Sequence, residues 1–117
     1  MTTTYTLTAD LTNLLAELGA YFKKKHLSAL YLDQTTFVGK TGCVRIDTYQ
    51  ILNAWWRGYI TVNVYVFRPD MLTDELQIKV SLFSSYWVSP TRLMKAIQKE
   101  IHNFFLSHGA TPSEGEQ

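Results

Sequence analysis

Two segments in which aliphatic residues occupy every second position constrain the fold of this 117-residue chain more than any other feature. The aliphatic positions are Ile60, Val62, Val64 and Val66 in the first segment, residues 59–67, and Leu76, Ile78, Val80 and Leu82 in the second. An alternation with a period of two predicts a β-strand with one apolar face and one more polar face. A sheet built from these strands needs cover on its aliphatic face only.

Two segments with helical periodicity can supply that cover. A helix is predicted over residues 10–25, with the apolar stripe Leu11, Leu14, Leu15, Leu18 and Phe22. The lysines at 23–25 close this helix at the negative end of its dipole. A second helix follows Ser89 and Pro90, with the apolar face Leu93, Met94, Ile97, Ile101, Phe104 and Phe105. Gly109 is predicted to end it as a left-handed cap.

Shorter β-segments complete the predicted fold. Residues 35–38 and 43–51 flank the glycine-containing loop 39–42 and predict a hairpin, and residues 3–8 predict a short edge strand. We therefore expect a two-layer α+β sandwich in the order (β)-α-β-β-β-β-α, whose antiparallel sheet of three to five strands carries both helices on one face. A single domain is predicted over residues 1–109, followed by a disordered polar tail over residues 110–117.

The second face of the predicted sheet combines aromatic and neutral polar side chains. The outward positions are predicted to be Arg45, Asp47, Tyr49, Tyr59, Thr61, Asn63, Tyr65, Phe67, Gln77, Lys79, Ser81 and Phe83, and the strand ends add Trp55, Trp56 and Trp87. The candidate interaction residues among them are Arg45, Tyr49, Tyr59, Asn63, Tyr65, Phe67, Lys79, Phe83 and the three tryptophans. Exposed aromatics mixed with hydrogen-bonding groups are typical of protein interfaces. Tyrosine and threonine are also good strand formers that cross-strand neighbours shield, so both interpretations stay open.

Composition restricts the compartment and the chemistry. The formal net charge is +1, which disfavours a dedicated duplex-binding protein. The single cysteine, Cys43, allows neither an internal disulfide nor a multi-cysteine zinc site, and it is predicted to be a small buried side chain. The sequence contains neither a secretory signal nor an apolar stretch long enough to span a bilayer. We expect a cytoplasmic protein without membrane contact.

Known catalytic patterns are not matched by this sequence. Gly39-Lys40-Thr41 lacks the glycine that a phosphate-binding loop requires at position 34, where Gln34 stands. The three histidines, His26, His102 and His108, do not have the spacing of metal ligands. The prediction is therefore a non-enzymatic protein with no catalytic residues, no cofactor and no metal.

A single-stranded nucleic acid is the alternative partner for the aromatic face. Stacking rings with basic side chains nearby bind single strands, and Arg45, Lys79, Arg57 and Lys40 are the candidate phosphate contacts. Asp47 is expected to share that face, and the net charge is low, so nucleic acid ranks second to protein.

The segment Arg57-Gly58-Tyr59-Ile60-Thr61-Val62-Asn63-Val64-Tyr65-Val66, together with the helix from Arg92 to Ile101, resembles tail-completion or tail-terminator proteins of tailed bacteriophages. The resemblance covers about a third of the chain. Such proteins often end in a strand, whereas the sequence here predicts a helix last. The resemblance implies a small α+β subunit without catalytic residues that assembles through sheet and loop surfaces, and a virion-associated location. Both arguments lead to an interaction or assembly subunit whose partner is a copy of itself or another protein.

Overall fold

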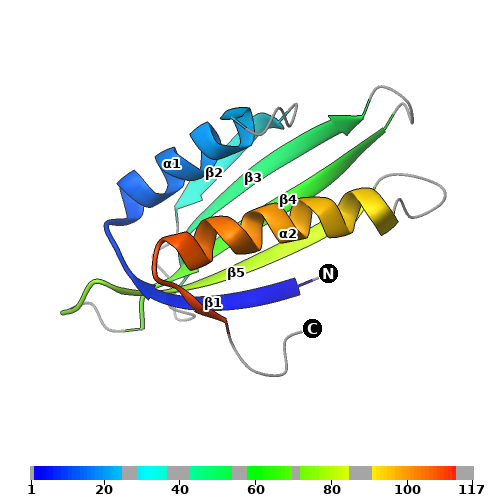
Figure 1. Ribbon diagram of the computed structural model, residues 1–117. Helices are drawn as coiled ribbons and strands as arrows, with labels where there is room; N and C mark the ends of the chain where they lie inside the picture. Colours follow the sequence, from blue (N-terminus) through cyan, green and yellow to red (C-terminus); the bar gives the residue numbers. More distant parts are fainter. Residues whose placement is uncertain are drawn as a thin grey trace.

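The computed structural model of the protein describes residues 2–24, 29–36, 43–53, 58–69, 72–84 and 91–112. It confirms the α+β sandwich, with an antiparallel sheet on one side and two helices on the other (Figure 1). The elements are β1 (Thr2–Thr8), α1 (Leu11–Lys24), β2 (Ala29–Thr36), β3 (Cys43–Asn53), β4 (Gly58–Phe67), β5 (Glu75–Ser84), α2 (Thr91–Ser107) and β6 (Thr111–Pro112).

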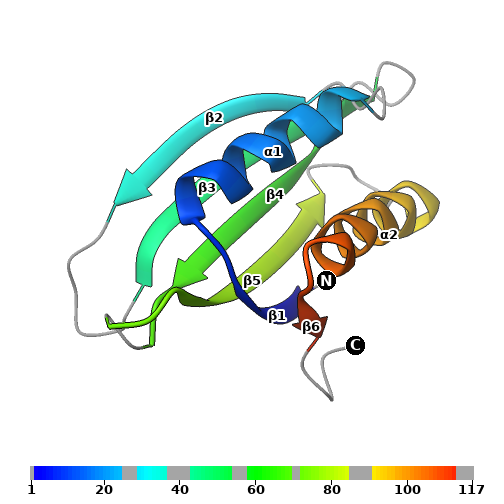
Figure 2. The same cartoon turned by 60° about the vertical axis from the view of Figure 1, so that its left-hand side comes forward.

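The sheet has the strand order β2-β3-β4-β5-β1-β6, and every neighbouring pair is antiparallel. β1 lies beside β5, although some seventy residues separate them in the chain. β2 is the strand at the far edge of the sheet from β1 and β6. The connection from β1 to β2 therefore crosses over the sheet, and α1 lies in this connection (Figure 2). α1 lies over the β2 side and α2 over the β5 side, so the two helices share the cover of one face.

The core forms between that face and the helices, as the alternation predicts. Ile60, Val62, Val64 and Val66 of β4 are completely buried, and the four aliphatic residues of β5 are at most 3% exposed. Leu14, Leu15, Leu18 and Phe22 of α1 are buried against them, as are Met94, Ile97, Ile101, Phe104 and Phe105 of α2. Cys43 is buried as well, as predicted, but it is paired with Phe67 of β4 and does not belong to this core cluster.

Aromatic and polar contacts join the elements around this core. The Tyr21 ring packs edge-on against Phe104 with ring centroids 5.3 Å apart, and its hydroxyl donates to Glu100 at 2.8 Å, so α1 is tied to α2. Tyr5 of β1 stacks on Phe105 at 4.8 Å, and its hydroxyl lies 3.0 Å from Nδ1 of His102. Burial raises the pKa of Tyr5 to about 12, so this hydroxyl stays protonated and able to donate near neutral pH.

Two segments differ from the sequence-based prediction. The strand predicted over 35–38 is found earlier, over Ala29–Thr36, because it pairs along β3 from Ala29 opposite Ile51. Residues 110–112 do not belong to a disordered tail: Ala110 is buried, and Thr111–Pro112 pairs with Tyr5 and Thr6 of β1. The predicted loop 39–42, His26 and residues 113–117 lie outside the described residues.

Neither α1 nor α2, the helices in the part of the chain that the structure describes, is long and apolar enough to cross a membrane.

The turn after α2 explains how the chain reaches β6. Gly109 has φ +81°, its N–H donates to the carbonyl of Leu106 at 3.1 Å, and the N–H of Ala110 donates to the carbonyl of Phe105 at 3.0 Å. These two bonds form a Schellman motif, which satisfies carbonyls at the helix end and reverses the chain. The left-handed conformation predicted at Gly109 is confirmed.

Gly109→Ala is expected to lower the free energy of unfolding by about 1 kcal/mol, because a side chain is strained at positive φ. Steric crowding adds nothing, since no atom lies within 4 Å of the added Cβ. Urea denaturation measures the change, and Gly109→Asn serves as the control because asparagine tolerates this conformation better. Equal losses in the two variants would contradict the proposed cause.

Candidate protein-interaction face

The sheet face opposite the helices carries no described helix or strand, as both views of the fold show (Figures 1 and 2). We call it the open face and define it by the strand register. Its residues are Thr2, Thr4, Thr6 and Thr8 of β1; Ile46, Thr48 and Gln50 of β3; Thr61, Asn63, Tyr65 and Phe67 of β4; and Glu75, Gln77, Lys79, Ser81 and Phe83 of β5.

The open face consists of cross-strand rows, since directly paired residues point to the same side of a sheet. One row runs Ile46, Tyr65, Lys79 and Thr4, and its neighbour runs Thr48, Asn63, Ser81 and Thr2. Side chains within these rows shield one another, so Tyr65 and Asn63 are half-buried; Thr61, in the next row with Gln50 and Phe83, is only 7% exposed. Phe83 is 51% exposed at the end of β5. The open face is therefore a closely packed surface with one prominent aromatic ring.

The polar groups of the open face are largely neutral. The Thr48 hydroxyl donates to Oδ1 of Asn63 at 2.8 Å, between β3 and β4. Lys79 and Glu75 are the two charged side chains among the residues that define the face; both lie on β5, and their charges are of opposite sign. Such a surface is removed from water at lower cost than a charged one, because charged groups carry the largest desolvation penalty.

Three β3 residues predicted on this face lie on the other one. Tyr49 is opposite Val62 and Asp47 opposite Val64, so both face the helices, as does Arg45 opposite Val66. The Tyr49 ring is 4% exposed and packs edge-on against Phe22 with centroids 5.1 Å apart. The prediction that Arg45, Asp47 and Tyr49 point outward is wrong, because their polarity suggested solvent whereas the pairing with β4 sets the side.

The other candidates divide into two groups. Asn63, Tyr65, Phe67, Lys79 and Phe83 lie on the open face, as predicted. Trp55, Trp56, Trp87 and the side chain of Tyr59 lie outside the described part of the chain. Sequence reasoning missed the residues that complete the face, namely Ile46, Thr48 and Gln50 of β3, Thr2, Thr4, Thr6 and Thr8 of β1, and Glu75 of β5. The sequence of β3 holds no deciding signal for them, because its two isoleucines lie on opposite faces, Ile46 on the open one and Ile51 on the buried one.

Arg45, Asp47 and Tyr49, the β3 residues that face the helices, line a groove of about 420 Å³ beside α1. The α1 wall consists of Thr12, Leu15, Ala16, Gly19 and Ala20, and the floor consists of Arg45, Asp47 and Tyr49. Asp47 is 1% exposed, and its two oxygens accept from Nε and Nη2 of Arg45 at 2.7 and 3.1 Å. This bidentate pairing satisfies the buried carboxylate, so a structural role accounts for it.

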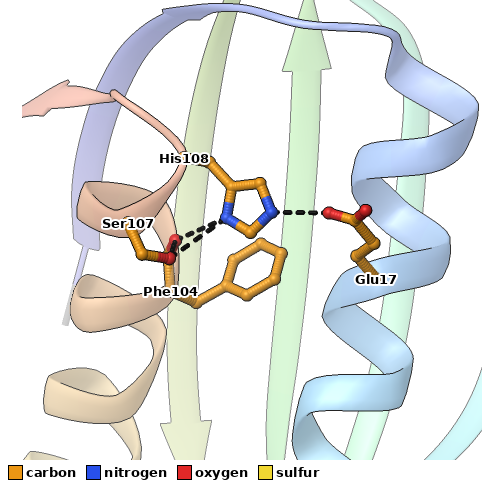
Figure 3. A network of polar contacts seen from close by, with 4 residues as sticks. All are labelled: Glu17, Phe104, Ser107 and His108. Carbon is orange, nitrogen blue, oxygen red and sulfur yellow. Dashed lines mark hydrogen bonds and ion pairs between the residues drawn. The ribbon is translucent and has the colours of Figure 1, made fainter.

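A second polar cluster joins the C-terminal end of α2 to the middle of α1 and brings serine, histidine and glutamate together (Figure 3). Nε2 of His108 lies 2.5 Å from Oε2 of Glu17, and Nδ1 lies 2.8 Å from the carbonyl oxygen of Phe104. The Ser107 hydroxyl is 3.3 Å from Nδ1, but it donates to the same Phe104 carbonyl at 2.7 Å.

The hydrogen bonds of this cluster indicate a helix cap rather than nucleophilic chemistry. A carbonyl oxygen only accepts, so Nδ1 of His108 carries a proton and does not serve as a base for Ser107. The ring also packs on Phe104 at a tilt of 36°, with ring centroids 4.3 Å apart. His108 thus covers the last turn of α2 and bridges it to α1, which goes beyond the dipole role that the sequence indicated.

The charge state of His108 follows from its neighbours. Burial acts to lower its pKa, but the Phe104 carbonyl and the Glu17 carboxylate favour the charged ring more strongly. The pKa of His108 is therefore raised above its ordinary value of about 6.5.

No protein-family model, curated protein or solved structure matches this chain. Within the described residues, no group of three or more His, Cys, Asp or Glu side chains is placed to hold a metal ion.

Removing Arg45 alone is expected to destabilise the fold more than removing the whole ion pair. Arg45→Leu leaves the Asp47 carboxylate buried without its bidentate partner, at a cost of about 3 kcal/mol in unfolding free energy. Replacing both residues with leucine removes the unpaired charge and should restore part of that loss. Urea unfolding of the two variants decides, and a double variant less stable than Arg45→Leu would refute this account.

The contact between His108 and Glu17 is expected to stabilise the fold mainly at low pH. Because the pKa of His108 is raised on folding, its contribution is complete below about pH 6.5 and lost as pH rises through the raised value. Glu17 is 58% exposed, so solvent screening limits the coupling to about 0.5 kcal/mol. A double-mutant cycle of Glu17→Gln and His108→Gln, measured at about pH 5.5 and about pH 9, tests this. Coupling of equal size at both pH values would exclude the titration of His108 as its source.

Proposed function

We propose that this protein is a non-enzymatic assembly subunit that associates with other copies of itself through the open face. The observation that carries the proposal is the uneven cover of the sheet. Both helices lie on the aliphatic face, while the open face presents Tyr65, Phe67 and Phe83 among neutral polar side chains. Large rings in a neutral surface are the usual anchors of protein contacts.

The polar groups of the open face support this proposal. The Thr48 to Asn63 bond shows that neighbouring strands partly satisfy each other's hydrogen-bonding groups. A partner therefore covers Tyr65 and Phe67 without leaving these groups unpaired. The resemblance to tail-completion subunits of bacteriophages agrees with an assembly role and a virion-associated location.

A single-stranded nucleic acid fits the open face less well than the sequence suggested. Arg45, one of the expected phosphate contacts, is turned toward the helices and paired with Asp47. Lys79 is then the only basic side chain among the residues that define the face. One cation neutralises at most one phosphate, so electrostatic attraction to a strand is weak.

Tyr65→Glu is expected to weaken self-association at least tenfold, because a carboxylate at the centre of the contact loses its water without gaining a partner. Light scattering coupled to size-exclusion chromatography, over a range of protein concentrations, measures the effect. Asn103→Glu is the matched control, since it adds the same charge on the exposed side of α2. Circular dichroism establishes that both variants are folded.

The parent protein is expected to show a mass above that of one chain, and Asn103→Glu should retain it. A parent that stays strictly monomeric at the highest concentration would overturn the proposal. So would association that Tyr65→Glu leaves unchanged. Binding of a labelled single-stranded oligonucleotide at low salt that Lys79→Gln abolishes would assign the open face to nucleic acid instead.

A further inference from the structure

An exposed leucine at one end of the sheet matches the groove beside α1 in size and charge. We infer that the segment 72–74 of one copy of this chain binds the groove of a second copy. Leu72 enters the groove, and the carboxylate of Asp74 faces Lys24. This contact goes beyond the open-face association proposed above, because it uses other surfaces of the molecule.

Leu72 lies in the turn between β4 and β5 and projects into water. Its side chain is 94% exposed, against 51% for Phe83 and 43% for Leu106, the other exposed large hydrophobic residues in the part of the chain that the structure describes. The N–H of Ala9 donates to the carbonyl of Asp74 at 3.3 Å, so the end of β1 anchors the segment. Removing the leucine from water is favourable, and the anchored backbone loses little freedom on binding.

The groove beside α1 offers an apolar site for such a side chain. Ala16, Gly19 and Ala20 form much of its α1 wall, and the groove has a volume of about 420 Å³. An apolar cavity of about 150 Å³ already holds a molecule of the size of benzene, so a leucine side chain fits this groove. On the floor, Arg45 and Asp47 neutralise each other through two hydrogen bonds. An apolar occupant therefore leaves no single charge unpaired there.

Charge sets the direction in which the segment lies in the groove. Asp74 is exposed two residues after Leu72, and Lys23 and Lys24 are exposed at the C-terminal end of α1. Lys24 lies one helical turn, about 6 Å along the axis, beyond Ala20. Two extended residues span at most about 7 Å, so with Leu72 over Ala20 the Asp74 carboxylate reaches Lys24. Opposite charges placed in this way steer the encounter and fix its register.

The two contact surfaces lie at opposite ends of the molecule. The turn between β4 and β5 is near the start of α1, whereas Lys23 and Lys24 are at the far end of that helix (Figures 1 and 2). A chain's own Leu72 is therefore remote from its own Ala20, and the occupant is another copy. Because the two surfaces differ, the contact is head-to-tail and leaves one segment and one groove open to further copies.

Paramagnetic relaxation in NMR spectra tests this contact, because it detects even weak association between two differently labelled copies. One copy carries a nitroxide at Pro69→Cys, in the turn that contains Leu72, and the other copy is enriched in ¹⁵N. Cys43 is buried and does not compete for the nitroxide. Both copies carry Tyr65→Glu, which weakens the open-face contact, so the measurement does not depend on that contact.

The expected result is the loss of the amide signals of Ala16, Gly19 and Ala20 in the ¹⁵N copy. A nitroxide at Asn103→Cys, on the exposed side of α2, is the control for random collisions. It should leave these three signals intact.

Two pairs of variants test the residues that make the contact. Leu72→Asp in the nitroxide copy should restore the signals, because a carboxylate against an apolar wall loses its water without gaining a partner. Leu106→Asp, the same change at another exposed leucine, should not restore them. Ala16→Glu in the ¹⁵N copy should also restore them, and Ala96→Glu on the exposed side of α2 is its control.

Placing Leu72→Asp in the ¹⁵N copy instead distinguishes a head-to-tail contact from a symmetric one. The signals should still be lost, since that copy supplies only the groove. Restored signals would overturn the head-to-tail arrangement.

Signals that survive at the highest protein concentration, or a loss that Leu72→Asp in the nitroxide copy does not reverse, would overturn this contact. The open-face proposal would stand in that case, because light scattering tests it separately on Tyr65→Glu. Conversely, loss of the groove signals together with association that Tyr65→Glu leaves unchanged would support this contact and refute the open-face proposal.

Discussion

The burial of one side of β4 beneath both helices is the constraint on which the rest of this structure depends. Ile60, Val62, Val64 and Val66 are completely buried, and β4 is hydrogen-bonded to strands on both sides. Covering this aliphatic row takes both helices, because α1 reaches it from the β2 side and α2 from the β5 side. With both helices on one face, no helix of the described residues covers the other, and the proposed contact uses the side chains of that open face.

The register of β3 against β4 determines which β3 residues face the helices, and it therefore affects both the stability of the fold and the composition of the candidate site. Placing Asp47 under α1 requires a charge partner in the same layer, and Arg45 supplies it through two hydrogen bonds. The open face therefore contains Ile46, Thr48 and Gln50, where the sequence predicted Arg45, Asp47 and Tyr49. Compared with that prediction, the open face has two fewer charges, one positive and one negative. This change disfavours nucleic acid and favours a neutral protein surface.

The parts of the fold that the sequence predicted share a clear period. β4 and β5 alternate without exception in aliphatic residues, and the stripes of α1 and α2 match the helical repeat, so their existence and buried sides follow directly. β3 is different because both of its faces contain polar residues, with Arg45 and Asp47 on one and Thr48 and Gln50 on the other. Its period of two is clear, but the polarity of its residues does not say which face is buried. For the same reason, five of the predicted interaction residues were placed correctly, whereas Arg45 and Tyr49 were not.

The sequence by itself determined the class of fold, the aliphatic row at its centre and the turn at Gly109, because each depends on residues close together in the chain. Only the tertiary structure decided the membership of the open face, since that depends on the register of β3 against β4. It also decided the pairing of β1 with β5 and β6, and the contact between Glu17 and His108. These contacts join residues far apart in the chain, and no local pattern encodes them. They form only when burial of the β4 row brings the helices and strands together.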